Sequence, residues 1–197
     1  AGDLVVWSYG FVLMFFDAAE EISKVDKQLC QYINEHYKPC LFVVNKWDLL
    51  ADKDVYTEQW GDYLLEAFPT MAHVPVAFIT ATTGKNAKRL INHAQMLFKQ
   101  SRQRISTGEL NRVIRRAMER HPPPRIQHRL PKVFFATQAD IQPPTIVLMC
   151  NNPKAFPATY RRYLLGAIRD EVDFPEVPIR IFFDKRAHRE KPHEAKK

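Results

Sequence analysis

The sequence predicts an α/β domain with a parallel sheet, followed by a smaller α+β domain with the order α-β-β-α-β. Three observations predict this division. Short apolar segments alternate with helical patterns through residue 100, which is typical of a parallel sheet with crossover helices. After residue 105, two strand patterns follow one another between helices. Residues 1–100 carry 9 Lys and Arg against 12 Asp and Glu, whereas residues 101–197 carry 20 against 10. A basic second half favours contact with nucleic acid, although solvated surface charge is the simpler alternative.

The first half contains three strand–helix pairs, because apolar runs bounded by polar residues alternate with apolar residues at helical spacing. Residues 1–10 show no clear pattern. Strands are predicted at 11–16, 41–45 and 76–79, and helices at 24–37, 55–68 and 87–99. The residues predicted to face inward are Val25, Leu29 and Ile33 in the first helix, Trp60, Leu64, Leu65 and Phe68 in the second, and Leu90, Ile91, Ala94, Leu97 and Phe98 in the third.

The second half begins after a predicted polar linker, residues 101–105. Ser106 and Glu109 have the spacing of a capping box, which starts a helix that Pro122 ends. Two strands, a helix and a last strand are predicted at 132–137, 145–150, 160–172 and 177–183. The domains are thus predicted as 1–100 and 106–189, with a basic polar tail at 190–197. We expect Phe134, Phe135, Phe182 and Phe183 to lie in the core.

The most informative segment follows the strand at 41–45. Asn45-Lys46-Trp47-Asp48 begins where a buried strand ends, which is where open α/β sheets bind ligands. Asn-Lys-x-Asp resembles the guanine-specificity motif of GTPases, in which the Asp carboxylate accepts two hydrogen bonds from the base. Such paired, charge-assisted contacts are geometrically selective. Four residues alone are a weak signal, since a simple turn would also explain them.

A second motif supports the first. Thr80-Ala81-Thr82-Thr83-Gly84 follows the next predicted strand, 35 residues after Asn45. It resembles the Ser-Ala-x-x-Gly loop of GTPases, whose backbone N–H donates to the guanine oxygen. Together the motifs predict a guanine site made by Asn45, Lys46, Asp48, Thr80 and Ala81, in which Lys46 lies along the base and Asp48 reads it. Trp47 is predicted to pack rather than to bind.

Further segments extend the resemblance to the Der (EngA) family, bacterial GTPases with two tandem G domains and a C-terminal KH-like domain. They are Leu49-Leu50 after the first motif, Ser106-Thr107-x-x-Leu110-Asn111, Pro122-Pro123-Pro124, Tyr160-Arg161-Arg162-Tyr163-Leu164 and Pro178-Ile179-Arg180-Ile181. The resemblance covers about residues 11–189. It implies a partial P-loop GTPase domain followed by a KH-like domain. It also implies a GTPase that acts in maturation of the large (50S) ribosomal subunit, with GTP or GDP as ligand and ribosomal RNA as partner.

The chain departs from the family in one respect. No Gly-x-x-x-x-Gly-Lys-[Ser/Thr] sequence occurs in it, and the Asp-x-x-Gly of the second switch is absent. The P-loop supplies the phosphate cradle and a magnesium-binding hydroxyl. We therefore expect the chain to be the later part of a second G domain plus the KH-like domain, and to be inactive alone. Mg²⁺ is expected in the parent protein, with ligands outside this chain.

The predicted RNA contact cannot use the usual KH loop. Many KH domains grip nucleic acid through Gly-x-x-Gly, and after Gly108 the sequence contains only Gly166. RNA contact would therefore have to come from basic side chains, which bind phosphates rather than base edges. The candidates are Arg161, Arg162 and Arg169 in the predicted helix, and Lys185, Arg186 and Arg189 after the last predicted strand.

Several classes are disfavoured. Cys30, Cys40 and Cys150 have no zinc-ligand spacing and are expected to be buried and reduced, as in a cytoplasmic protein. No apolar segment has the length of a membrane span, and we expect a monomer. Two alternatives to the GTPase stay open, namely an RNA-binding module and a protein-interaction module, both without nucleotide control. Salt dependence separates them, because binding through several phosphates weakens steeply as salt rises.

Overall fold

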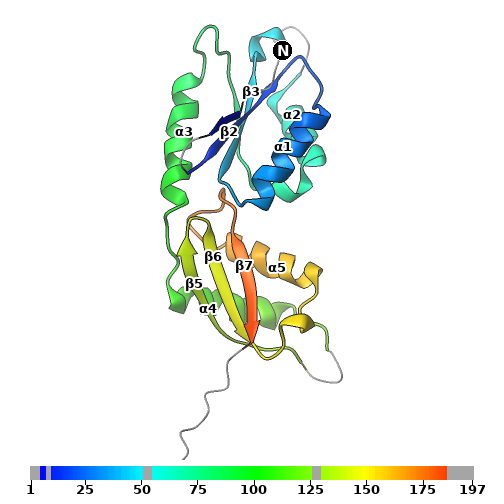
Figure 1. The fold of residues 1–197 in the computed structure, drawn as a ribbon, viewed down its shortest axis with the longest axis vertical. Helices are drawn as coiled ribbons and strands as arrows, with labels where there is room; N and C mark the ends of the chain where they lie inside the picture. The colour runs from blue at the N-terminus through cyan, green and yellow to red at the C-terminus, as the bar shows by residue number, and fades with distance from the viewer. Residues whose placement is uncertain (1–4, 8–9, 51–54, 126–129, 186–197) are drawn as a thin grey trace, which may run out of the picture.

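The protein consists of two domains stacked along its long axis (Figure 1). The structure is a computed structural model that describes residues 5–7, 10–50, 55–125 and 130–185. The first domain contains a four-stranded sheet and the second a three-stranded sheet. This architecture confirms a partial G domain with a parallel sheet, followed by a KH-like α+β domain.

The first sheet has the strand order β1-β2-β3-β4. Strands β2 (Val12–Asp17), β3 (Cys40–Asn45) and β4 (Val76–Phe78) are parallel, as predicted. Strand β3 is buried along its length until Asn45, because it lies between two strands and has helices on both faces. Strand β1 (Val5–Trp7), which was not predicted, pairs antiparallel with β2 at the sheet edge.

Three helices cover this sheet: α1 (Lys24–Glu35), α2 (Thr57–Ala67) and α3 (Ala87–Gln100). Ile33 of α1 and Leu64 of α2 pack with Phe42 and Val44 on one face, whereas Leu97 of α3 packs with residues of the other face. Each helix buries a narrower stripe than predicted. Inward positions were wrong for four apolar residues whose side chains are largely exposed: Val25 (58 %), Leu65 (49 %), Ile91 (57 %) and Phe98 (37 %).

The second domain has the predicted order α-β-β-α-β. Its elements are α4 (Thr107–Arg120), β5 (Val133–Ile141), β6 (Pro144–Cys150), α5 (Ala158–Arg169) and β7 (Arg180–Lys185). Strand β6 is central, antiparallel to β5 and parallel to β7. A short 3₁₀ turn occurs at Pro153–Ala155, and the first domain has such turns at Trp47–Leu50 and Pro69–Met71. Strand β7 begins later than predicted and includes Lys185, which we had expected beyond the strand.

Helices α4 and α5 lie on one face of the second sheet, and the other face is open (Figure 1). The core prediction is therefore wrong for Phe135 and Phe182, which are 45 % and 49 % exposed, and for Phe134, which is also exposed. Phe134 lies at a register shift between β5 and β6. Phe183, in contrast, packs against the core and lies 4.9 Å from the Phe156 ring, centroid to centroid.

One hydrophobic core joins the domains. Leu41, Val43 and Leu97 of the first domain belong to the same buried cluster as Leu110 and Val177 of the second. The predicted linker takes part in this contact, since Ser101 is fully buried and the Ile105 N–H donates to Gln138 Oε1 over 2.9 Å. The division into 1–100 and 106–189 stays a prediction.

Candidate functional site

The predicted guanine-binding residues gather at the carboxyl ends of the parallel strands. Asp17 and Asn45 are paired neighbours at the ends of β2 and β3. The Trp47 N–H donates to Ile79 O, just beyond β4, over 3.1 Å. The chain therefore brings the Asn45–Asp48 segment beside the loop that begins at Thr80, at the edge where parallel sheets bind ligands.

A side-chain hydrogen bond connects the two predicted loops. Asn45 Oδ1 accepts from the Ala81 N–H over 3.0 Å, across 36 residues of sequence. The Asn45 side chain therefore connects the end of β3 with the loop that follows β4. The Asn86 side chain adds a second support, since its Nδ2 donates to Phe78 O over 2.9 Å at the start of α3. The backbone around Ala81 is thus fixed relative to β3.

Asp48 lies in the 3₁₀ turn after β3 and is exposed. Within the described part of the chain its carboxylate accepts no hydrogen bond, so both oxygens are available to a ligand. Trp47 packs instead, as predicted, with its ring 4.5 Å from the Phe78 ring. The Lys46 backbone has φ +60°, a conformation that turns the chain sharply just before these two residues.

Sequence reasoning missed Asp17 as a member of this site. Lys46 Nζ lies 2.5 Å from Asp17 Oδ2, and Asp17 also accepts from the Ala19 N–H. The Lys46 side chain is 45 % exposed and the Asp17 side chain only 11 %. This contact holds the pKa of Asp17 below its usual value and raises the pKa of Lys46. The available signal was an acidic residue that ends the strand next to β3.

Thr80 lies beneath the surface of the site. Its side chain is 2 % exposed, and its hydroxyl has no hydrogen-bond partner among the described residues. A buried hydroxyl without a partner is costly. The Thr80 N–H donates to Lys85 O, which closes the loop around Ala81. The predicted residues Asn45, Lys46, Asp48, Thr80 and Ala81 therefore form one cluster.

The predicted RNA-contact residues differ in what their side chains contact. Arg161 donates to Phe156 O and Pro153 O, each over 2.8 Å, and lies 4.5 Å from the Phe183 ring. Arg169 donates to Pro175 O and Val177 O, and burial lowers its pKa to about 10. Both guanidinium groups therefore support loops of this chain. Arg162 and Lys185 are exposed. Arg186 and Arg189 lie outside the described residues.

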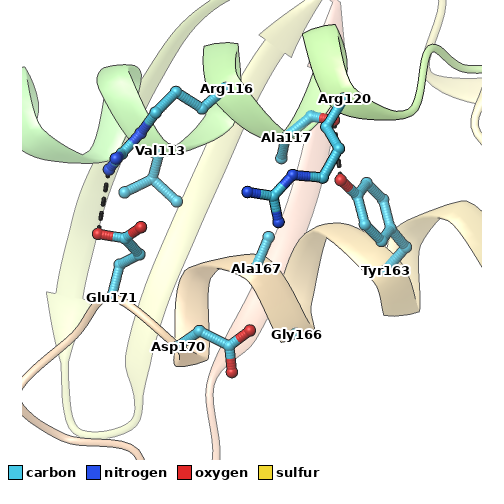
Figure 2. Close-up of a pocket in the computed structure, with 9 residues that line it drawn as sticks. All are labelled: Val113, Arg116, Ala117, Arg120, Tyr163, Gly166, Ala167, Asp170 and Glu171. Atoms are coloured by element: carbon cyan, nitrogen blue, oxygen red, sulfur yellow. Dashed lines mark hydrogen bonds and ion pairs between the residues drawn. The ribbon is translucent and has the colours of Figure 1, made fainter.

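The helical face of the second domain contains a groove of about 340 Å³ between α4 and α5 (Figure 2). Figure 2 shows Arg116 and Arg120 on the α4 side and Asp170 and Glu171 on the α5 side. Arg116 pairs with Glu171 over 3.0 Å. The α4 side of the groove is thus basic and the α5 side acidic, and the acidic side disfavours binding of a polyanion in the groove.

Comparisons with known proteins agree with this geometry. Residues 104–183 match the family model described as the KH-domain-like domain of EngA bacterial GTPase enzymes, C-terminal. The "GTPase Der" of Rhodopirellula baltica is 55 % identical over 91 % of this chain and 39 % of its own length. Those of Desulforamulus reducens and Geobacter metallireducens are each 35 % identical, over 88 % and 91 % of this chain and 40 % and 41 % of their own lengths.

The chain is similar to the Der (EngA) GTPases over most of its length. It spans about two fifths of the length of the Der proteins named above. The predicted resemblance is confirmed for both halves, because the similarity extends over most of the chain and the KH-like match covers the second domain. The names of these relatives describe them as GTPases.

Further observations concern the cysteines, the helices and the side chains that could bind a metal ion. Cys30, Cys40 and Cys150 are buried and free, and burial raises the pKa of each thiol. No helix among the described residues is long and apolar enough to span a membrane. The same residues contain no group of three or more His, Cys, Asp or Glu side chains suited to a metal ion.

Proposed function

We propose that this chain is the guanine-recognition and RNA-contact part of a GTPase that acts in maturation of the large ribosomal subunit. Asp48 reads the base, the Lys46 stem lies along its plane, and Thr80 and Ala81 complete the pocket. The observation that carries the proposal is the hydrogen bond from the Ala81 N–H to Asn45 Oδ1, which connects both predicted loops and leaves Asp48 open to a ligand.

The phosphates and Mg²⁺ require residues that the 197-residue sequence does not contain, since it has no P-loop motif. We therefore expect hydrolysis only in a protein that also contains a P-loop, and none in this chain alone. The proposed cytoplasmic location and monomeric state accompany this function. The intact mass and N-terminal sequence of the natural protein test whether this chain belongs to a longer protein with a P-loop.

Base specificity is the sharpest test of the site. In a natural protein that contains this chain together with a P-loop, Asp48→Asn should weaken the binding of guanine nucleotides and improve the binding of xanthine nucleotides. The reason is that xanthine offers an acceptor where guanine offers an amine. Sites with such pairing discriminate by roughly 10⁴. Competition with GDP and xanthosine diphosphate measures the change. Unchanged preference for guanine in Asp48→Asn would contradict the assignment.

The second domain is proposed to contact ribosomal RNA through basic side chains, of which Arg162 and Lys185 are exposed in the structure. Support comes from the charge of the second half, 20 Lys and Arg against 10 Asp and Glu. Binding should weaken steeply with salt if several phosphates are contacted. An RNA-binding or protein-interaction module without nucleotide control is the alternative, favoured by the missing P-loop motif.

A further inference from the structure

The face of the second sheet opposite its helices carries apolar and aromatic side chains. Along β6, Ile146, Leu148 and Cys150 are fully buried beneath the helices, so Val147 and Met149 point to the opposite face. Phe182 pairs with Val147 in register, and Phe135 pairs with Met149. We call these four residues, Phe135, Val147, Met149 and Phe182, the aromatic sheet face.

The two rings are placed to hold two separate planar groups. Phe135 lies on β5 and Phe182 on β7, so β6 separates them, and their backbones are about 10 Å apart across the sheet. They also lie in different cross-strand rows, one with Met149 and the other with Val147. Each ring is about half exposed. The rings therefore do not cover one another, and both are accessible.

A stacked array continues from this face toward the first domain. The Arg180 guanidinium lies 5.9 Å from the Phe182 ring centroid and 4.6 Å from that of Tyr37, which precedes β3. The Arg180 guanidinium thus lies between the Phe182 ring of the second domain and the Tyr37 ring of the first. Lys38, next to Tyr37, is exposed. The array provides π surfaces with positive charge beside them.

Positive charge is also present at the other end of the aromatic sheet face. Lys132 is exposed there. Asp184 lies in the Met149 row, and its carboxylate accepts a hydrogen bond from the Lys185 N–H. Asp140 also belongs to this face, since it pairs with Thr145, the partner of Arg180. The named cations Arg180, Lys38 and Lys132 exceed the acids Asp140 and Asp184 by one, which favours a polyanion as partner.

We propose that the aromatic sheet face binds single-stranded RNA, with bases stacked on Phe135 and Phe182 and the phosphates near Arg180 and Lys132. Stacking on aromatic side chains is the way proteins bind unpaired bases with little sequence preference. The inference rests on the proposed RNA contact of the second domain, but it moves that contact away from the helical face. The mixed charges of the α4–α5 groove agree with this placement.

The test uses the 197-residue chain and a short fluorescein-labelled oligouridine, with fluorescence anisotropy at fixed low salt. Phe135→Leu and Phe182→Leu keep an apolar side chain but remove the π surface. Each should weaken binding roughly fivefold or more, because stacking contributes about that factor or higher per base. Phe182→Tyr keeps an aromatic ring and should bind like the unmodified chain. Tyr56→Leu, which removes a ring that is 62 % exposed in the first domain, is the matched control and should change nothing.

A second readout locates the RNA directly. Ultraviolet cross-linking followed by mass spectrometry should label peptides that contain β5 or β7, and Phe182→Leu should remove the β7 label. Thermal unfolding of each variant shows whether the domain stays folded, which is expected because both rings are half exposed.

Three results would overturn the inference. If Arg162→Ala removes binding and both leucine variants bind like the unmodified chain, the RNA lies on the helical face, and only the proposed RNA contact survives. If the unmodified chain binds no RNA at low salt, the RNA part of the proposed function fails as well. If the leucine variants leave RNA binding unchanged but turn a dimer into a monomer, the aromatic sheet face is a protein contact.

Discussion

Replacing Asn111 with Ala should destabilise the second domain strongly. Asn111 lies on α4, and its amide makes two hydrogen bonds to β5: its Oδ1 accepts from the Ala136 N–H over 2.9 Å, and its Nδ2 donates to Ala136 O over 2.8 Å. Ala136 is fully buried, so the substitution leaves two backbone groups without a partner. At about 1–3 kcal/mol for each of the two unsatisfied groups, the free energy of unfolding should fall by about 2–6 kcal/mol.

Urea denaturation, followed by circular dichroism, measures this change. Asn151→Ala is a matched control, because Asn151 makes a similar contact, accepting from the Lys132 N–H over 3.0 Å, but is exposed. Water can replace that bond, so its loss should cost less than about 1 kcal/mol. Hydrogen exchange at the Ala136 amide should accelerate in Asn111→Ala only. Equal destabilisation by the two substitutions would refute the reasoning from burial.

Two further predictions concern pH. Asp17→Asn should lower stability slightly at pH 7, because Lys46 loses its partner, and it should reduce the loss of stability below pH 3.8, where Asp17 of the unmodified protein takes up a proton on unfolding. Urea midpoints at pH 7 and 3 test this, and an unchanged acid limb would contradict it. His73 has its pKa lowered from 6.5 to about 3 by burial and by Arg169, so the unfolded chain takes up this proton first. The resulting stabilisation is complete above pH 6.5 and decreases below it, by up to about 2 kcal/mol at pH 5. His73→Gln should flatten this dependence, and an equally steep decline in the variant would count against it.

The three parallel strands of the first sheet could be predicted from the sequence because each is a short apolar run followed by polar residues, whereas β1 has no such pattern. The contact between the Asn45 and Ala81 loops followed from the same fact, since parallel strands bring their carboxyl ends to one edge. Helical faces were predicted less well. Leu90, Ala94 and Leu97 face the sheet, and the neighbouring Ile91 falls to the side of this stripe, a difference that apolar character alone does not reveal.

Long-range partners were the other limit. Arg161 and Arg169 are basic residues on a predicted helix, and nothing local indicates that they donate to carbonyl groups of loops. Phe135 and Phe182 have the pattern of buried strand residues, but the domain places both helices on one side of its sheet. Asp17 could not be connected with Lys46 from sequence, because 29 residues separate them and the pair depends on the register of β2 and β3.

The shared core between the domains has a practical consequence for anyone who produces the KH-like half by itself. Val177 is fully buried and Ile105 and Ile179 nearly so, in the cluster that includes Leu41 and Val43 of β3. Expressed as residues 104–183 only, the domain would expose this apolar surface to water and tend to aggregate. The two halves are better purified, crystallised and labelled as a single piece.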